Sequence, residues 1–136
     1  MKKIILASGL ALLGFWGFAS AQTAPPPPST PDPFAGKVKF ASERVDFGVT
    51  KFNKPVTVQF QFTNIGSQPL VIENVQASCG CTTPKWPKDP ILPNQNGTIS
   101  ATFSGNAMGM VNKTVWVRFQ GINDDMELHL VGKVEN

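Results

Sequence analysis

Two cysteines separated by one glycine, Cys79-Gly80-Cys81, carry the most evident chemistry of this sequence, and the chain has no others. Thiolates at positions i and i+2 can chelate one soft metal ion, and thiolate or thioether ligands select Cu(I). The same sulfurs can close a very small disulfide ring, whose strain would make it easy to reduce. A third interpretation is structural, with both thiols packed at a strand end or linked to another chain. The residues leave all three open.

Met108-Gly109-Met110 is the second group of sulfur ligands. The cysteines follow a strand expected at residues 70–75, and the methionines follow one expected at residues 99–103. Successive loops of an antiparallel sandwich alternate between its two ends. The cysteine loop and the methionine loop can therefore share an end if a short strand at 91–92, or a long return with no strand, lies between them. Met108 and Met110 would then be auxiliary Cu(I) ligands beside Cys79 and Cys81. Their ordinary alternative role is to cover the open core.

His129 is the only histidine, and strand alternation puts it on a polar face with Glu127 and Lys133. A hydrolytic triad needs a nucleophile, a base and an orienting group in contact. One outward histidine and the lack of a Gly-x-Ser-x-Gly element give such chemistry little support. We therefore expect no catalytic residues, and thiol redox chemistry at the cysteine pair is the enzymatic alternative.

The elements that position these residues alternate between apolar and polar side chains with a period of two, which predicts half-buried strands. Such runs occur at 38–40, 45–47, 56–63, 70–75, 98–103, 114–119 and 126–134. Turn-forming residues separate them, and no window favours an amphipathic helix. The pattern predicts an all-β fold, an immunoglobulin-like antiparallel β-sandwich of about seven strands.

The last two strands are expected to form a hairpin across the loop Gln120–Asp125. The predicted register pairs Val117 with Leu128 and Val115 with Leu130, because this keeps both apolar sets in the core. It also places Arg118 opposite Glu127, and Trp116 opposite His129. Trp116 and His129 are then on the solvent face, where a large aromatic residue is a candidate for binding a partner.

Residues 1–21 have the three parts of a secretory signal peptide: Lys2 and Lys3, an apolar run over residues 4–18, and the cleavage pattern Ala19-Ser20-Ala21. The run is shorter than the roughly 18–20 residues that span a bilayer. Cleavage would leave Gln22 first and no transmembrane segment. We expect an exported bacterial protein, periplasmic or secreted, in an oxidising compartment.

Residues 22–35 are rich in proline and predict an extended spacer. The folded domain is expected over residues 36–136. The net charge of +3 falls to +1 without Lys2 and Lys3, and no block of like charges remains. The sequence therefore argues against nucleic-acid binding.

Residues 60–84 carry three short motifs in one unbroken register. They are Phe60-x-Phe62-x-Asn64-x-Gly66, Pro69-Leu70-x-Ile72-x-x-Val75 and Ser78-Cys79-Gly80-Cys81-Thr82-x-Pro84. This region closely resembles the bacterial exported family catalogued as domain of unknown function 1573. Downstream, Pro90-Ile91-x-Pro93 and Leu128-x-Leu130-x-Gly132-x-Val134 are also similar to it. Asn94, where the family usually has Gly, and the methionine loop depart from its pattern.

The resemblance implies an immunoglobulin-like fold and export, and it implies no particular activity. From residues and resemblance together, we expect a non-catalytic binding or structural module of the bacterial cell envelope. Its partner would be an envelope protein or ligand that the sequence does not identify. The alternative is a periplasmic Cu(I)-binding or thiol-redox protein that uses Cys79 and Cys81.

Overall fold

The computed structural model describes residues 30–136. The predicted signal peptide and residues 22–29 of the predicted linker lie outside the described residues. Eight strands make up the fold: β1 (Val38–Phe40), β2 (Arg44–Lys51), β3 (Val56–Asn64), β4 (Ile72–Ala77), β5 (Thr82–Lys85), β6 (Asn96–Phe103), β7 (Gly109–Phe119) and β8 (Asp125–Glu135). Within residues 30–136, no helix has the length and apolar character needed to cross a membrane.

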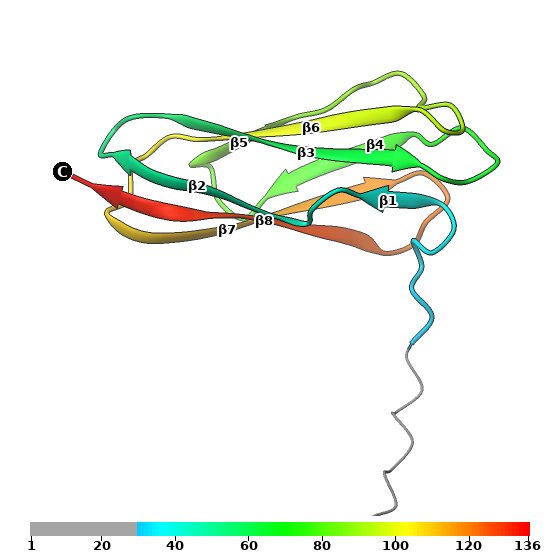
Figure 1. Cartoon of the computed structure of the whole chain (residues 1–136), viewed down its shortest axis with the longest axis horizontal. Helices are drawn as coiled ribbons and strands as arrows, with labels where there is room; N and C mark the ends of the chain where they lie inside the picture. Colours follow the sequence, from blue (N-terminus) through cyan, green and yellow to red (C-terminus); the bar gives the residue numbers. More distant parts are fainter. Residues whose placement is uncertain (1–29) are drawn as a thin grey trace, which may run out of the picture.

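The strands form two four-stranded sheets packed face to face (Figure 1). Sheet A has the order β1-β3-β6-β5, and sheet B has the order β2-β8-β7-β4. Neighbours are antiparallel except β2, which lies parallel to β8. That pair arises because the chain passes from the edge of sheet A to the edge of sheet B between β1 and β2 while keeping its direction (Figure 1). The predicted immunoglobulin-like sandwich is confirmed.

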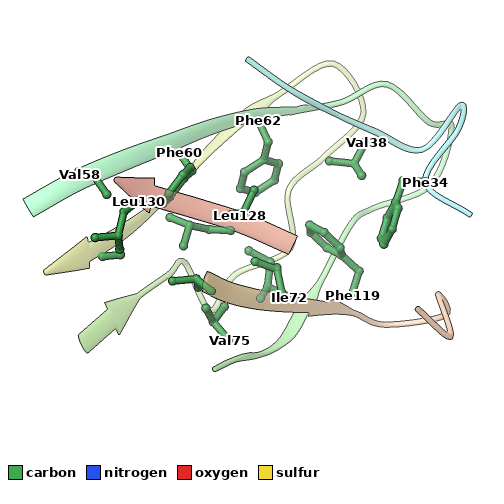
Figure 2. Close-up of a cluster of buried hydrophobic side chains, with 14 of the residues drawn as sticks. Phe34, Val38, Val58, Phe60, Phe62, Ile72, Val75, Phe119, Leu128 and Leu130 are labelled. Atoms are coloured by element: carbon green, nitrogen blue, oxygen red, sulfur yellow. The ribbon is translucent and has the colours of Figure 1, made fainter. Parts of the chain in front are cut away.

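The inward-facing residues of both sheets meet in one core, which Figure 2 shows. The alternating residues of β3 (Val58, Phe60, Phe62) and β7 (Val115, Val117, Phe119) point into it, as their periodicity predicts. The ring of Phe119 meets that of Phe62 edge to face at 5.9 Å. Phe34, which the sequence assigned to the linker, is 7% exposed and packs against Phe119.

The alternation of the sequence did not predict β5. Its residues Thr82 to Lys85 include a proline and no large apolar side chain, so they lack the pattern of a strand. Pro84 is tolerated because β5 is the edge of sheet A and need not donate a hydrogen bond on its free side. Residues 91–92 contribute an isolated bridge between Leu70 and Ile91, in place of a strand.

The predicted register of the β7–β8 hairpin is wrong by two residues. The structure pairs Val115 with Leu128 and Arg118 with Asp125. The amide of Ile122 donates to the carbonyl of Phe119 at 3.2 Å, and this tight turn buries the Ile122 side chain. The ladder therefore continues to Asp125, and the loop is shorter than expected. Inward and outward faces are unchanged, because a shift of two residues preserves parity.

Three connections meet at the end of the sandwich where the C-terminus lies (Figure 1, left). They are the β2–β3 turn, the β4–β5 connection with both cysteines, and the β6–β7 connection with Met108. The amide of Asn53 donates to the carbonyl of Gly105 at 3.0 Å, and that of Ser104 donates to the carbonyl of Cys81 at 2.9 Å. These hydrogen bonds connect the three loops to one another.

Candidate functional site

Cys79 and Cys81 lie in the turn that carries the chain from β4, an edge strand of sheet B, to β5, an edge strand of sheet A. Their sulfurs are joined in a disulfide, and their Cα atoms are 5.2 Å apart. The amide of Thr82 donates to the carbonyl of Cys79 at 3.3 Å and closes the turn. Gly80 is exposed at its tip, with nothing within 4 Å of the position that a Cβ would occupy.

Hydrogen bonds attach this cysteine turn, residues 78–82, to both sheets. On the side of sheet B, the amide of Ser78 donates to the carbonyl of Thr114 at 2.9 Å, and the amide of Thr114 donates to the Ser78 hydroxyl at 3.2 Å. On the side of sheet A, the Ser104 amide reaches the carbonyl of Cys81. Contacts other than the disulfide therefore anchor the turn to both sheets.

The disulfide itself adds little to stability. Its loop spans three residues, since the cysteines are two apart in sequence. The chain-entropy model assigns such a loop about 1.6 kcal/mol, against about 3 kcal/mol for a loop of fifteen residues.

The two sulfurs share one buried hydroxyl. Thr82 is 4% exposed, and its Oγ1 lies 3.9 Å from the Cys79 sulfur and 4.0 Å from the Cys81 sulfur. Both cysteines are half-buried, and Cys81 packs against the hydrophobic core. Cys79 lies between the exposed residues Ser78 and Gly80. The two sulfurs thus have different surroundings.

The proposed methionine ligands are separated from one another. The β6–β7 connection does reach the end that carries the cysteine turn, and Met108 is half exposed on it. Met110, however, is a residue of β7, is 81% exposed, and lies opposite Lys133 of β8 on the outer face of sheet B. Within residues 30–136, no three His, Cys, Asp or Glu side chains form a metal-binding group. Cu(I) binding would need the reduced cysteines, and it stays a prediction.

The outer face of sheet B carries the other candidate residues. Trp116 and His129 both point outward, from β7 and β8. The Trp116 indole donates through Nε1 to Oε1 of Glu127 at 3.2 Å, and His129 Nε2 lies 4.0 Å from the other oxygen of Glu127. His129 Nδ1 is 3.2 Å from the Thr114 hydroxyl, its actual cross-strand neighbour. Glu127 therefore connects Trp116 to His129, which the predicted register placed directly opposite each other.

Trp116 borders a recess of about 330 Å³ on this face. Its lining adds three residues of β4 to those of the hairpin: Glu73, Asn74, Gln76, Trp116, Arg118 and Asp125. We call this set, together with Glu127 and His129, the Trp116 patch. The sequence did not identify the three β4 residues as part of a site. Their polar side chains, in a strand that precedes the cysteine motif, were the signal for an outward polar face.

An ion pair fixes one side of the Trp116 patch. The Arg118 guanidinium binds both carboxylate oxygens of Asp125, with its Nη2 2.9 Å from Oδ2. These hydrogen bonds, and the charge of Arg118, lower the pKa of Asp125 below its ordinary value. The same hydrogen bonds and the neighbouring carboxylates raise the pKa of Arg118. The guanidinium is thereby held in one orientation beside the recess.

Replacement of Arg118 by Gln should raise the pKa of Asp125 toward its ordinary value of 3.8. The ion pair stabilises the fold above that value, and its contribution is lost as the pH falls through the lowered pKa of the folded state. Because the pair is exposed, its effect on stability is small. Titration of the Asp125 carboxyl by NMR in both proteins tests this, and an identical midpoint would contradict it.

The outer face of sheet A is chemically different. Along β3 and β6 it presents only uncharged hydroxyl and amide side chains: Thr57, Gln59, Gln61, Thr98, Ser100 and Thr102. Thr57 and Thr102 share a hydrogen bond of 2.8 Å across the strands. Among the outward-facing residues of β3, β6, β7 and β8, the large aromatic residue and the charged groups are found on β7 and β8, in sheet B.

The model of a family described as "Protein of unknown function (DUF1573)" matches residues 38–134. No curated protein matches the chain. Among solved structures, the chain is similar to a protein of unknown function from Porphyromonas gingivalis W83, with a TM-score of 0.62 and 12% identity. That match covers 72% of this chain and 46% of the other, so this chain spans about half the length of the Porphyromonas protein.

Two further structures share the fold. The ASH/PapD-like domain of human CEP192 gives a TM-score of 0.64 at 12% identity, over 80% of this chain and 92% of that domain. The secreted serine protease VesC from Vibrio cholerae gives 0.58 at 9% identity, over 74% of this chain and 23% of the protease. At such identities the similarity shows the fold alone, an immunoglobulin-like sandwich.

Proposed function

The chain belongs to DUF1573, a family of proteins of unknown function, and we propose that it is an exported, non-catalytic binding module of the bacterial cell envelope. The leader of residues 1–21 supports export. The disulfide between Cys79 and Cys81 fits an oxidising compartment such as the periplasm. Intact-mass analysis of the exported protein should give a chain that begins at Gln22, and a mass that includes Met1 would contradict cleavage.

The observation that carries the binding proposal is the ordered, outward-facing Trp116 at the centre of sheet B. Its indole is held by Glu127 and flanked by the Arg118–Asp125 ion pair, so little side-chain freedom is left to lose on binding. Tryptophan and arginine are also the residues most enriched among those that dominate binding energies. The Trp116 patch is therefore the surface we assign to the partner.

The sheet edges are poorly suited to strand addition, which favours binding through a face. In sheet A, β1 has three residues and β5 contains Pro84. In sheet B, β2 is irregular between Asp46 and Val49, and β4 is irregular between Ile72 and Asn74. Short strands, bulges and edge prolines all hinder pairing with another strand. All four edges of the described sandwich carry one of these features.

Replacement of Trp116 by Ala should abolish most of the binding. Loss of a central aromatic residue typically costs at least about 2 kcal/mol, roughly a 30-fold loss of affinity. The test is recovery of a cross-linked partner with the full-length exported protein from its own envelope, with Gln59→Ala on sheet A as the control. Equal recovery with both variants would contradict the assignment of the surface.

A further inference from the structure

The cysteine turn takes no part in the proposed binding surface, and its geometry allows the disulfide to open within the folded protein. The turn is held by Ser78 on the side of sheet B and by Ser104 on the side of sheet A, in each case through main-chain hydrogen bonds. These bonds do not involve the sulfurs. We therefore expect both cysteines to stay in place when the sulfur–sulfur bond breaks, with Cα atoms near their present separation of 5.2 Å.

The loop closed by the disulfide is too short for the usual structural role. A disulfide stabilises a fold mainly by restricting the unfolded chain, and the restriction grows with the number of residues enclosed. Cys79 and Cys81 enclose only Gly80. This disulfide is half-buried at an exposed turn, and solvent access is one feature of labile or catalytic disulfides.

The surroundings of the two sulfurs distinguish an attacked atom from a leaving atom. Cys79 lies between exposed neighbours, and the open space around Gly80 leaves room for an approaching thiolate. Cys81 packs against the core and is followed by the buried Thr82. Attack on a disulfide depends on which sulfur is accessible. Access therefore favours Cys79 as the atom attacked.

A buried hydroxyl lies beside both sulfurs, including the one that would leave. The Thr82 hydroxyl is 4.0 Å from the Cys81 sulfur. A hydroxyl that donates to a thiolate stabilises the charged form. The Thr82 hydroxyl is thus placed to stabilise negative charge on a sulfur as the bond breaks.

We propose that the Cys79–Cys81 disulfide accepts two electrons from a dithiol of a partner protein by thiol–disulfide exchange. A partner thiolate attacks the Cys79 sulfur, the sulfur–sulfur bond breaks, and its electron pair leaves with Cys81, which takes up a proton. The second partner thiolate then attacks the partner sulfur of the mixed disulfide and releases Cys79, which takes up the second proton. The partner ends as a disulfide, and this chain ends as a dithiol.

The first test reduces the folded mature protein with glutathione as the probe. Alkylation and mass spectrometry should show both cysteines modified, while circular dichroism shows the β-sheet signal unchanged. A disulfide that becomes reducible only in denaturant would overturn the proposal and assign the bond a purely structural role.

The second test assigns the sulfurs with single-cysteine variants and an aromatic disulfide reagent that releases a coloured thiol. The thiol of Cys79 in Cys81→Ser should react about 10-fold faster than that of Cys81 in Cys79→Ser, because access controls reactivity. The opposite order would overturn the assignment of Cys79. Thr82→Val should slow the reduction of the wild-type disulfide several-fold and Thr82→Ser should not, whereas equal rates would remove Thr82 from the mechanism.

Discussion

Gly105→Ala should destabilise the domain by about 3 kcal/mol or more, the sum of two costs at one position. Gly105 has a φ of +75°, and an L-residue there loses roughly 1–2 kcal/mol. A Cβ at this position would also overlap the main chain of Lys54, whose carbonyl oxygen and nitrogen both lie too close. Backbone cannot move aside as a flexible side chain can, so the β2–β3 turn must shift.

Gly48 supplies the matched control for this prediction. Its φ is +74°, but nothing lies within 4 Å of the position of its Cβ. Gly48→Ala should therefore cost only the conformational part, roughly 1–2 kcal/mol. Urea denaturation of both variants separates the two costs. Equal destabilisation by the two substitutions would show that the steric contact with Lys54 adds nothing to the loss of unfolding free energy.

Asn64→Ala should cost on the order of 3 kcal/mol, because it removes three hydrogen bonds of a buried side chain, each worth about 1 kcal/mol. Asn64 is 1% exposed. Its Nδ2 donates to the carbonyls of Gln68 and Ile91, both at 2.8 Å, and its Oδ1 accepts from the amide of Gly66 at 3.0 Å. The side chain thus connects the loop after β3 to the segment before β6.

Thermal unfolding measures this effect directly, since about 3 kcal/mol lowers the Tm of a domain of this size by roughly 12–24 °C. Asn96→Ala is the control, because Asn96 is exposed and makes a single side-chain bond, to Thr63 at 2.7 Å. Its substitution should change the Tm by only a few degrees. A drop of similar size in both variants would contradict the role assigned to Asn64.

Alternation along single strands made most of the fold predictable. The apolar residues of β3 and β7 that the period of two assigned to the core are buried there, except Val56, which is half-buried against it. Trp116 faces outward as its parity requires. What could not be predicted depends on turns and tertiary neighbours. The register of the last hairpin goes with the tight turn that buries Ile122. The residues of β5 form a strand because they pair with β6.

The candidate site was predictable in part for the same reason. The spacing of Cys79 and Cys81 identified a pair able to bond, and strand parity identified Trp116 and His129. The sequence did not place Glu127 between those two residues, because that contact depends on the register. Nor did it bring Glu73, Asn74 and Gln76 to the patch, since the pairing of β4 with β7 joins segments about 40 residues apart.

Site-specific photo-cross-linking tests the central claim, that partners bind the outer face of sheet B, most directly. Gln76 in β4 and Gln59 in β3 are a matched pair, because both are exposed glutamines that face outward from opposite sheets. A photoreactive residue at position 76 of the exported protein should give a defined cross-linked product in the native envelope, and one at position 59 should give none. A product from position 59 alone, or products of equal yield from both, would contradict the claim.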